Sequence, residues 1–87
     1  MNNRKLYQRA INAWGISTQV TVAIEELSEL IKELCKAQRS TGDLQHIAEE
    51  VADVEIMCEQ LRHIFDIDSV VDAWKESKLK RLEQRLK

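Results

Sequence analysis

The sequence has 87 residues, of which 44% are apolar, and its formal net charge is −2. The length excludes a second hydrophobic core, so we interpret residues 1–87 as a single domain. The near-balanced charge excludes a general attraction to nucleic acid or anionic membranes, and the lack of an apolar run of about 18 residues or a signal-like N-terminus predicts a cytoplasmic protein. A chain this short buries little of its surface, so we expect it to form a homodimer or homotetramer.

Proline is absent and glycine occurs only twice, which predicts an all-α chain of four helices with few breaks. The first helix is expected from about residue 4 to residue 14, with Gly15 ending it. A second helix should begin at Ser17 or Thr18, whose hydroxyl groups suit an N-cap, and should end near Ser40. A short break at Gly15 is therefore expected between the two helices.

The segment 40–43 (STGD) predicts a turn, and Asp43 is a candidate N-cap for a third helix that reaches about Phe65. Residues 66–69 break the helical pattern. Ser69 and Asp72 then resemble the Ser-x-x-acid signature that opens a helix, here a fourth one running to the end of the chain. Because the second and third helices are joined by a short connection, we expect them to pack as an antiparallel pair.

Each of the two middle helices carries an apolar stripe at helical spacing. The expected stripes are Val20, Ala23, Ile24, Leu27, Leu30, Ile31 and Leu34 in the second helix, and Leu44, Ile47, Val51, Val54, Cys58, Leu61 and Phe65 in the third. We expect the two stripes to pack against each other. Cys35 and Cys58 suit neither a disulfide framework nor a zinc site, so both are interpreted as small core residues.

Two pairs of acidic residues occupy equivalent places beside these stripes, Glu26 with Glu29 and Glu50 with Asp53. The i, i+3 spacing directs both carboxylates of a pair the same way, so the pairs can converge across an interhelical groove. Magnesium prefers carboxylate oxygens together with substrate phosphates, and a cation relieves the repulsion among four acids. The spacing alone leaves a second interpretation open, in which these are solvated acids paired with nearby lysine or arginine side chains.

Charge is divided unevenly along the chain. From Glu25 to Glu59 there are ten acidic and three basic residues, a net charge of −7, whereas Lys75 to Lys87 contains six basic and two acidic residues, a net charge of +4. An acidic middle followed by a basic tail could hold a cation and a polyanion side by side. The alternative is that both segments are solvated helix faces. A nucleic-acid partner is disfavoured, because the body of the protein would repel a phosphate backbone.

Two motifs carry a family resemblance, over residues 25–30 (EELSEL) and 49–54 (EEVADV). Together they resemble the EExxE and ExxD motifs of MazG-type nucleoside triphosphate pyrophosphohydrolases. The relatives include all-α dUTPases, dCTP pyrophosphatases and the phosphoribosyl-ATP pyrophosphatase. The resemblance extends from Trp14 to Arg81, and it implies a four-helix MazG-like bundle completed by oligomerisation.

The resemblance also implies an activity, cleavage between the α and β phosphates of a nucleoside triphosphate to give the monophosphate and pyrophosphate. It assigns ligation of Mg²⁺, with Mn²⁺ as a substitute, to Glu26, Glu29, Glu50 and Asp53. Glu25 and Glu49 precede these ligands and are candidates to orient them or to position a water. Of the two, Glu25 is preferred as the general base.

Further residues are expected to contact the nucleotide. Lys78, Arg81 and Arg85 share one face of the last helix and are candidates to meet phosphate, the alternative being a solvated basic helix end. Trp14 is a candidate to stack on the base, although a tryptophan at a helix end is also typical of a core. Gln19 is a candidate polar contact to base or ribose, the alternative being an ordinary exposed glutamine.

The expected function is house-cleaning of the nucleotide pool, on canonical or noncanonical ribo- or deoxyribonucleoside triphosphates. One alternative is a dedicated dUTP or dCTP pyrophosphatase, which the sequence does not separate from the first. The other alternative comes from a different class, a non-catalytic helical module that only oligomerises or binds a partner. Stabilisation by magnesium distinguishes the enzyme from the module.

Overall fold

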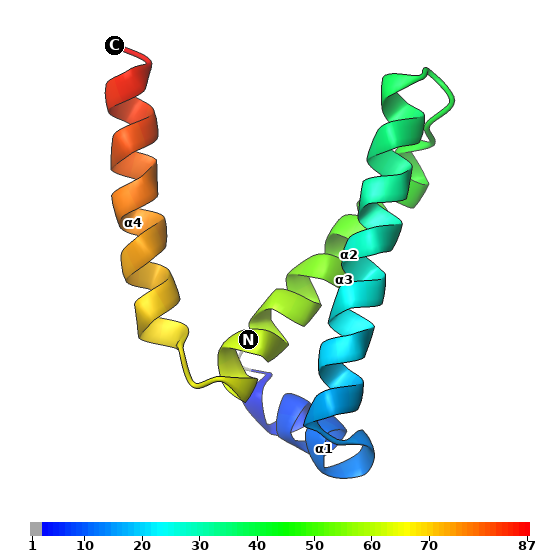
Figure 1. Ribbon diagram of the computed structural model, residues 1–87, viewed down its shortest axis with the longest axis vertical. Helices are drawn as coiled ribbons and strands as arrows, with labels where there is room; N and C mark the ends of the chain where they lie inside the picture. The colour runs from blue at the N-terminus through cyan, green and yellow to red at the C-terminus, as the bar shows by residue number, and fades with distance from the viewer. Residues whose placement is uncertain (1–2) are drawn as a thin grey trace.

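The computed structural model describes residues 3–87, which form four helices and no strand. The helices are α1 (Arg4–Trp14), α2 (Ile16–Gln38), α3 (Leu44–Ile64) and α4 (Asp68–Arg85), shown in Figure 1. The prediction of an all-α chain is therefore confirmed. Within the described residues, no helix combines the length and the apolar character needed to cross a membrane.

The boundary between α1 and α2 is a single residue, Gly15. Its φ of +91° lies in the region that favours glycine, and its amide donates to the carbonyl of Ile11 at 2.7 Å, which ends α1. The helix end predicted here is confirmed. The predicted N-cap at Ser17 or Thr18 is wrong, because α2 already begins at Ile16 and both hydroxyl residues lie inside its first turn. Gly15 is both the C-cap of α1 and the N-cap of α2, so Ser17 and Thr18 lie within the helix and cannot act as its N-cap.

The turn between α2 and α3 follows the sequence closely. The Asp43 carboxylate accepts a hydrogen bond from the Gln45 amide at 2.8 Å, as expected of an N-cap. Gly42 lies so close to the end of α2 that a Cβ atom there would be 2.7 Å from the Cα of Ala37. This close approach lets a short connection return the chain, and α2 and α3 form an antiparallel hairpin (Figure 1).

The connection between α3 and α4 is also short, residues 65–67, with Asp66 at a φ of +51°. The fourth helix begins at Asp68, so the prediction that Ser69 opens it is wrong. Asp72 does not complete a capping box either. Its carboxylate instead accepts from the Arg62 guanidinium of α3 at 2.7 Å, because a charged donor competes better than a backbone amide.

Helix α1 crosses one end of the hairpin, whereas α4 leaves it as a separate arm, so the molecule has the outline of a V (Figure 1). The hydroxyl of Tyr7 donates to Glu59 at 2.9 Å, and Gln8 is within 2.9 Å of the His63 ring, which fixes α1 on α3. The radius of gyration is 15.6 Å. A compact domain of this length has a value of about 12 Å, so the chain is clearly extended.

The predicted packing of the two apolar stripes is in the main wrong. The seam, the face along which α2 and α3 meet, buries Gln19, Ala23 and Glu33 of α2 and Met57 and Gln60 of α3. The predicted stripes turn outward instead, as an outer apolar face whose exposed members are Ile24, Leu27, Ile31 and Leu34 of α2 and Leu44, Val51, Cys58 and Phe65 of α3. Each helix is thus rotated by roughly 90° about its own axis from the expected orientation.

The cysteine prediction fails for the same reason. Cys35 and Cys58 are both exposed and reduced, on helix surfaces that face away from the seam. The buried apolar side chains of the described residues are only Tyr7, Ala23 and Met57. One copy of the chain therefore has a very small hydrophobic core.

Candidate functional site

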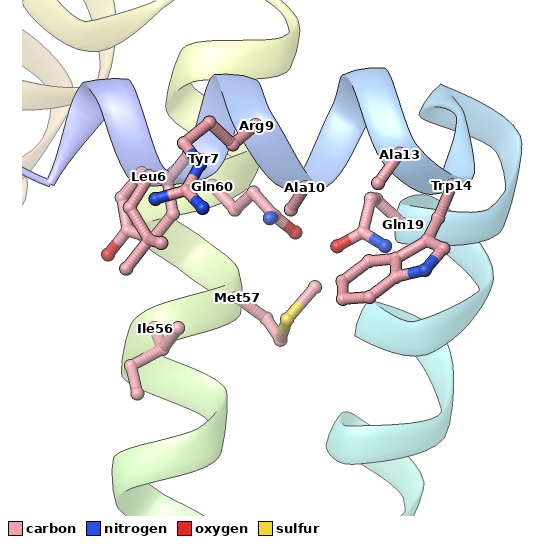
Figure 2. Close-up of a pocket in the computed structure, with 10 residues that line it drawn as sticks. All are labelled: Leu6, Tyr7, Arg9, Ala10, Ala13, Trp14, Gln19, Ile56, Met57 and Gln60. Carbon is pink, nitrogen blue, oxygen red and sulfur yellow. The ribbon is translucent and has the colours of Figure 1, made fainter.

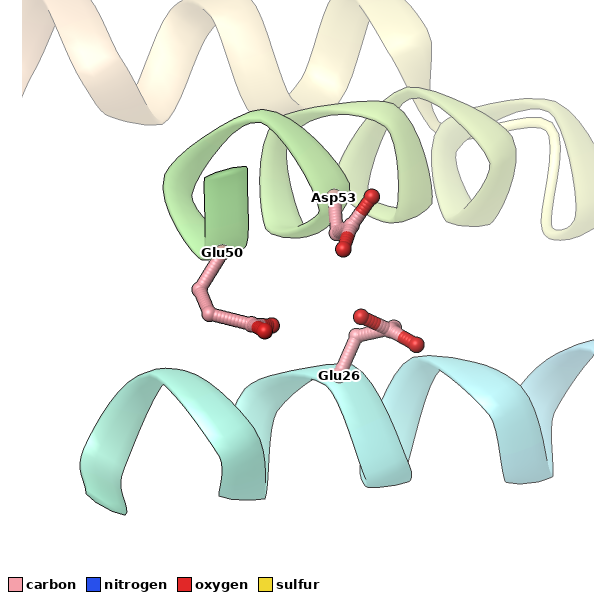
Figure 3. A group of neighbouring side chains, drawn as sticks. All are labelled: Glu26, Glu50 and Asp53. Atoms are coloured by element: carbon pink, nitrogen blue, oxygen red, sulfur yellow. The ribbon is translucent and has the colours of Figure 1, made fainter. Parts of the chain in front are cut away.

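Three carboxylates meet in the seam, from Glu26 on α2 and from Glu50 and Asp53 on α3. One oxygen of each lies within 4.8 Å of the others, and Figure 3 shows all three directed into the space between the two helices. Glu50 and Asp53 reach the same space because residues three apart share a helix face. The rotation that turned the apolar stripes outward is what placed these acids between the helices.

The electrostatics of this group oppose its full ionisation. Partial burial between the helices raises the pKa of Glu26, and the neighbouring charges of Asp53, Glu50 and Glu29 raise it further. Partial burial also raises the pKa of Glu50, reinforced by Asp53 and Glu29. Both pKa values move as expected for carboxylates that lose water and face like charges.

A cation fits this group of residues. The Oε2 atom of Glu50 is fully buried and has no hydrogen-bond partner among residues 3–87. A buried carboxylate oxygen without a partner is costly, and coordination of a metal would satisfy it. Hard divalent ions such as Mg²⁺ take oxygen ligands of this kind, so the donor set suits magnesium or manganese and not a soft metal.

The other acids of the two predicted motifs lie outside this close group. Glu29, the fourth predicted ligand, is exposed, although its charge is near enough to raise the pKa of both Glu26 and Glu50. Glu25 and Glu49 are also exposed. Of these two, Glu49 is close enough for its charge to raise the pKa of Glu50. The structure thus brings together three of the four predicted metal ligands.

A pocket of about 520 Å³ lies farther along the hairpin, beneath α1 (Figure 2). Its lining includes Trp14 and Gln19, which were predicted to contact the nucleotide, together with Met57 and Gln60. Trp14 is exposed at one edge, whereas Gln19 is only 5% exposed. Its size and its mostly apolar lining with a few polar groups are typical of a small-molecule pocket.

The pocket and the acids lie on the same side of both helices. Gln60 follows Asp53 by seven residues, and Gln19 precedes Glu26 by seven, which is two helical turns or about 10 Å along each axis. The carboxylates and the pocket are consequently neighbouring parts of one seam.

The three predicted phosphate ligands of the last helix are not at this site. Lys78, Arg81 and Arg85 are exposed on α4, and within residues 3–87 this helix contacts only α3. The ammonium group of Lys78 lies 5.8 Å from the centroid of the Trp74 ring on the same arm. Within one copy, the structure leaves these cations separate from the acidic group.

Two polar residues of the seam were not identified from the sequence. Gln60 is 4% exposed and its Oε1 atom lacks a partner, and Glu33 is buried beside Lys36, whose ammonium lies 3.5 Å away. Each lies seven residues after a predicted ligand, Gln60 after Asp53 and Glu33 after Glu26. That heptad spacing, which keeps residues on one face, was the available signal.

Comparison of the chain with protein-family models, with curated proteins and with solved structures gives no significant match.

Proposed function

We propose that this protein is a magnesium-dependent nucleoside triphosphate pyrophosphohydrolase, a hydrolase acting on an acid anhydride. The observation that carries the proposal is the group of Glu26, Glu50 and Asp53, with oxygens within 4.8 Å in a seam between two helices and one buried oxygen left without a partner. The motif resemblance to the MazG-type family supports the same activity. The proposed products are a nucleoside monophosphate and pyrophosphate.

The proposed ligands are Glu26, Glu50 and Asp53, with Glu29 completing the set at the exposed edge. Bound Mg²⁺ or Mn²⁺ supplies neutralisation of phosphate charge and a lower pKa for the attacking water. The carboxylates would hold the metal ion, whose positive charge would attract the phosphates, and α2 and α3 hold the carboxylates in place. Glu25 and Glu49 would act from outside the close group, on the position of a water, with Glu25 preferred as the base.

The pocket beneath α1 is the proposed place for the nucleoside. It lies about two helical turns from the carboxylates, on the same side of both helices. In this arrangement Trp14 offers a ring for stacking on the base, and Gln19 and Gln60 offer buried amide groups for hydrogen bonds to it. The specificity for base and sugar would be set here.

The working unit is proposed to be a homo-oligomer, because Lys78, Arg81 and Arg85 do not reach the acidic group of their own copy. If these cations meet substrate phosphates, they do so in an assembly. The proposed role is house-cleaning of the nucleotide pool.

The test is pyrophosphate release from a panel of ribo- and deoxyribonucleoside triphosphates, with magnesium and then with excess EDTA. Magnesium-dependent release supports the proposal, and release from dUTP or dCTP alone would indicate the dedicated enzyme. Absence of release from every nucleotide, together with no stabilisation by magnesium, would indicate the non-catalytic module.

A variant that removes one charge from the seam tests whether the activity depends on its acids. Glu50→Gln keeps the size of the side chain and removes its charge, and we expect the rate to fall more than about 100-fold, because even residues that only support metal ligands contribute roughly 10- to 100-fold. Glu55→Gln is the matched control, since it makes the same change at an exposed acid of the same helix. Equal rates for the two variants would refute the ligand assignment.

A further inference from the structure

Two glutamine side chains, one from each helix of the hairpin, are buried at the pocket beneath α1. Gln19 of α2 is 5% exposed, Gln60 of α3 is 4% exposed, and both line the pocket. Figure 2 shows their amide groups directed toward the same part of the pocket, with the oxygen of each on the side that faces the other. Most of the lining is apolar, and an amide buried in such surroundings is costly unless its polar atoms are paired.

The pocket does not supply a hydrogen-bond donor to the amide oxygen of Gln60. This Oε1 atom is fully buried and has no partner among residues 3–87. Of the other polar groups that line the pocket, the hydroxyl of Tyr7 already donates to a carboxylate of α3 at 2.9 Å, and Arg9 is exposed. The indole nitrogen of Trp14 lies on the side of its ring away from Gln60 (Figure 2). A bound molecule is therefore needed to supply the donor.

Two facing acceptors require a particular kind of ligand. An amide oxygen only accepts hydrogen bonds, so two of them face each other favourably when a group between them donates a hydrogen to each. An exocyclic amino group does this, because it carries two N–H bonds on one nitrogen. A carbonyl oxygen in the same place would be a third acceptor and would leave all three oxygens unpaired. The geometry favours an amino group over a carbonyl group at this point of the pocket.

The rest of the pocket suits a flat ring that carries such an amino group. Its apolar walls and the ring of Trp14 offer surfaces for stacking. In cytosine and adenine, the ring nitrogen beside the amino group is an acceptor, and the amide nitrogen of a glutamine can donate to it. Glutamine makes this pair of bonds with adenine in protein–DNA complexes. Uracil and hypoxanthine have the same ring shapes, but they present a carbonyl oxygen and a ring N–H in the reverse order.

We propose that this pocket selects a base with an exocyclic amino group, cytosine or adenine, over the carbonyl counterparts uracil and hypoxanthine. The amino group lies between the amide oxygens of Gln19 and Gln60. This inference rests on the proposed function, because it takes the pocket as the place of the substrate's base, and it narrows the substrates to cytosine and adenine nucleotides. Gln60 determines specificity and takes no part in the chemistry, since it lies two helical turns from Asp53, about 10 Å along α3.

The experiment compares kcat/KM, in magnesium, for two matched pairs of substrates, dCTP with dUTP and dATP with dITP. The members of each pair share a ring and differ in the amino or carbonyl group. We expect the amino member to exceed its counterpart by about 100-fold or more in at least one pair, because a site built to hydrogen-bond a group strongly rejects an analogue that lacks it. Ratios near one in both pairs would overturn the proposal, since water or a rotated amide would then satisfy the Gln60 oxygen.

A variant tests the amide itself. Gln60→Met keeps the length and flexibility of the side chain and removes an unpartnered polar atom, so the protein should still fold. We expect the amino-to-carbonyl ratio of kcat/KM to fall by about 10-fold or more, the effect of losing one buried hydrogen bond. Gln45→Met is the matched control, because it makes the same change at an exposed glutamine of α3, and it should keep the ratio. An unchanged ratio in Gln60→Met would overturn the assignment.

Nucleoside binding without metal separates this inference from the proposed activity. Deoxycytidine, deoxyuridine, adenosine and inosine are added at millimolar concentration to the full chain in EDTA, and the side-chain amide signals of Gln19 and Gln60 are followed by NMR. We expect these signals to shift with an amino nucleoside and much less with its carbonyl counterpart. Selective binding without pyrophosphate release from any triphosphate rejects only the proposed activity. Release with equal kcat/KM in both pairs rejects only this inference, and neither binding nor release rejects both.

Discussion

The hairpin has two contrasting faces, the seam between α2 and α3 and the outer apolar face. In the seam, Ala23 is 2% exposed, and the other buried or half-buried residues of the seam include the acids Glu26, Glu33 and Glu50. On the outer face, the next residue along, Ile24, is 62% exposed. Acids inside and aliphatic residues outside reverse the usual order of a small domain. The proposed metal site would account for the acids in the seam, and the proposed homo-oligomer would account for the aliphatic residues left exposed on the outer face.

The largest effect is expected when the same charge is placed at two adjacent positions of α2, one in the seam and one on the outer face. Ala23→Asp buries a further unpaired carboxylate in the seam, and we expect the free energy of unfolding to fall by about 3 kcal/mol or more. Ile24→Asp lies on the outer face and should act only through association. Urea denaturation followed by circular dichroism, at several protein concentrations, measures both.

The two variants differ in how they depend on dilution. The loss from Ala23→Asp should persist at every concentration, whereas the loss from Ile24→Asp should shrink where the wild type is itself a single copy. Equal losses that do not depend on concentration would contradict the division into seam and outer face.

Magnesium should have the next largest effect on stability, because in the proposed site it would neutralise only the carboxylates of the seam. At a concentration 100 times its dissociation constant, a ligand that binds only the folded state adds about 2.7 kcal/mol. We expect a rise in the melting temperature that EDTA reverses. The rise should disappear in Asp53→Asn and remain in Glu55→Gln. A rise of equal size in all three proteins would show that the ion binds elsewhere.

A smaller effect should appear without metal. Since the carboxylates of Glu26, Glu50 and Asp53 repel one another, Glu26→Gln should raise the melting temperature of the metal-free protein, although it removes a proposed ligand. In saturating magnesium the order should reverse, with the wild type more stable. Calorimetry with and without EDTA measures the crossing. A Glu26→Gln protein that is less stable under both conditions would contradict repulsion in the seam.

The smallest effect concerns the arm. The hydrogen bond from Arg62 lowers the pKa of Asp72 below its ordinary value of 3.8, so the pair stabilises the junction above that pH. As the pH falls through the lowered pKa, Asp72 takes up a proton and this contribution is lost. Asp72→Asn should thus be less stable than the wild type near neutral pH and equal to it in strong acid. An acid titration of both proteins, in which a difference persists at the lowest pH, would contradict this assignment.

Much of the fold could be predicted because its signals are local. The end of α1 at Gly15 and the cap at Asp43 each depend on residues within one turn, and both were predicted correctly. The predicted start of α4 was wrong, because Asp72 forms an ion pair with Arg62, ten residues away, and does not cap the helix. Local patterns do not contain such competing partners.

The orientation of the helices could not be predicted from the apolar stripes. Periodicity identifies the residues that form an apolar helix face, but it does not show whether that face packs within the chain or against another copy. The convergence of Glu26 with Glu50 and Asp53 was predicted from spacing, but with the helices rotated away from their observed orientation. Gln60 was overlooked although it lies seven residues after Asp53 and therefore on the same helix face, because a glutamine at that spacing is also ordinary on a solvated helix surface.

The scarcity of contacts between the arm α4 and the rest of the chain has a consequence for the stability of this helix. A helix of 18 residues with little tertiary support is only slightly longer than the shortest that is stable in water, about 12 to 15 residues. On dilution, the amide hydrogens of α4 should therefore exchange with solvent long before those of the hairpin, whose helices protect each other. In the proposed homo-oligomer, the arm would gain its full helical order on assembly, so that folding of this segment and binding of another copy would be coupled.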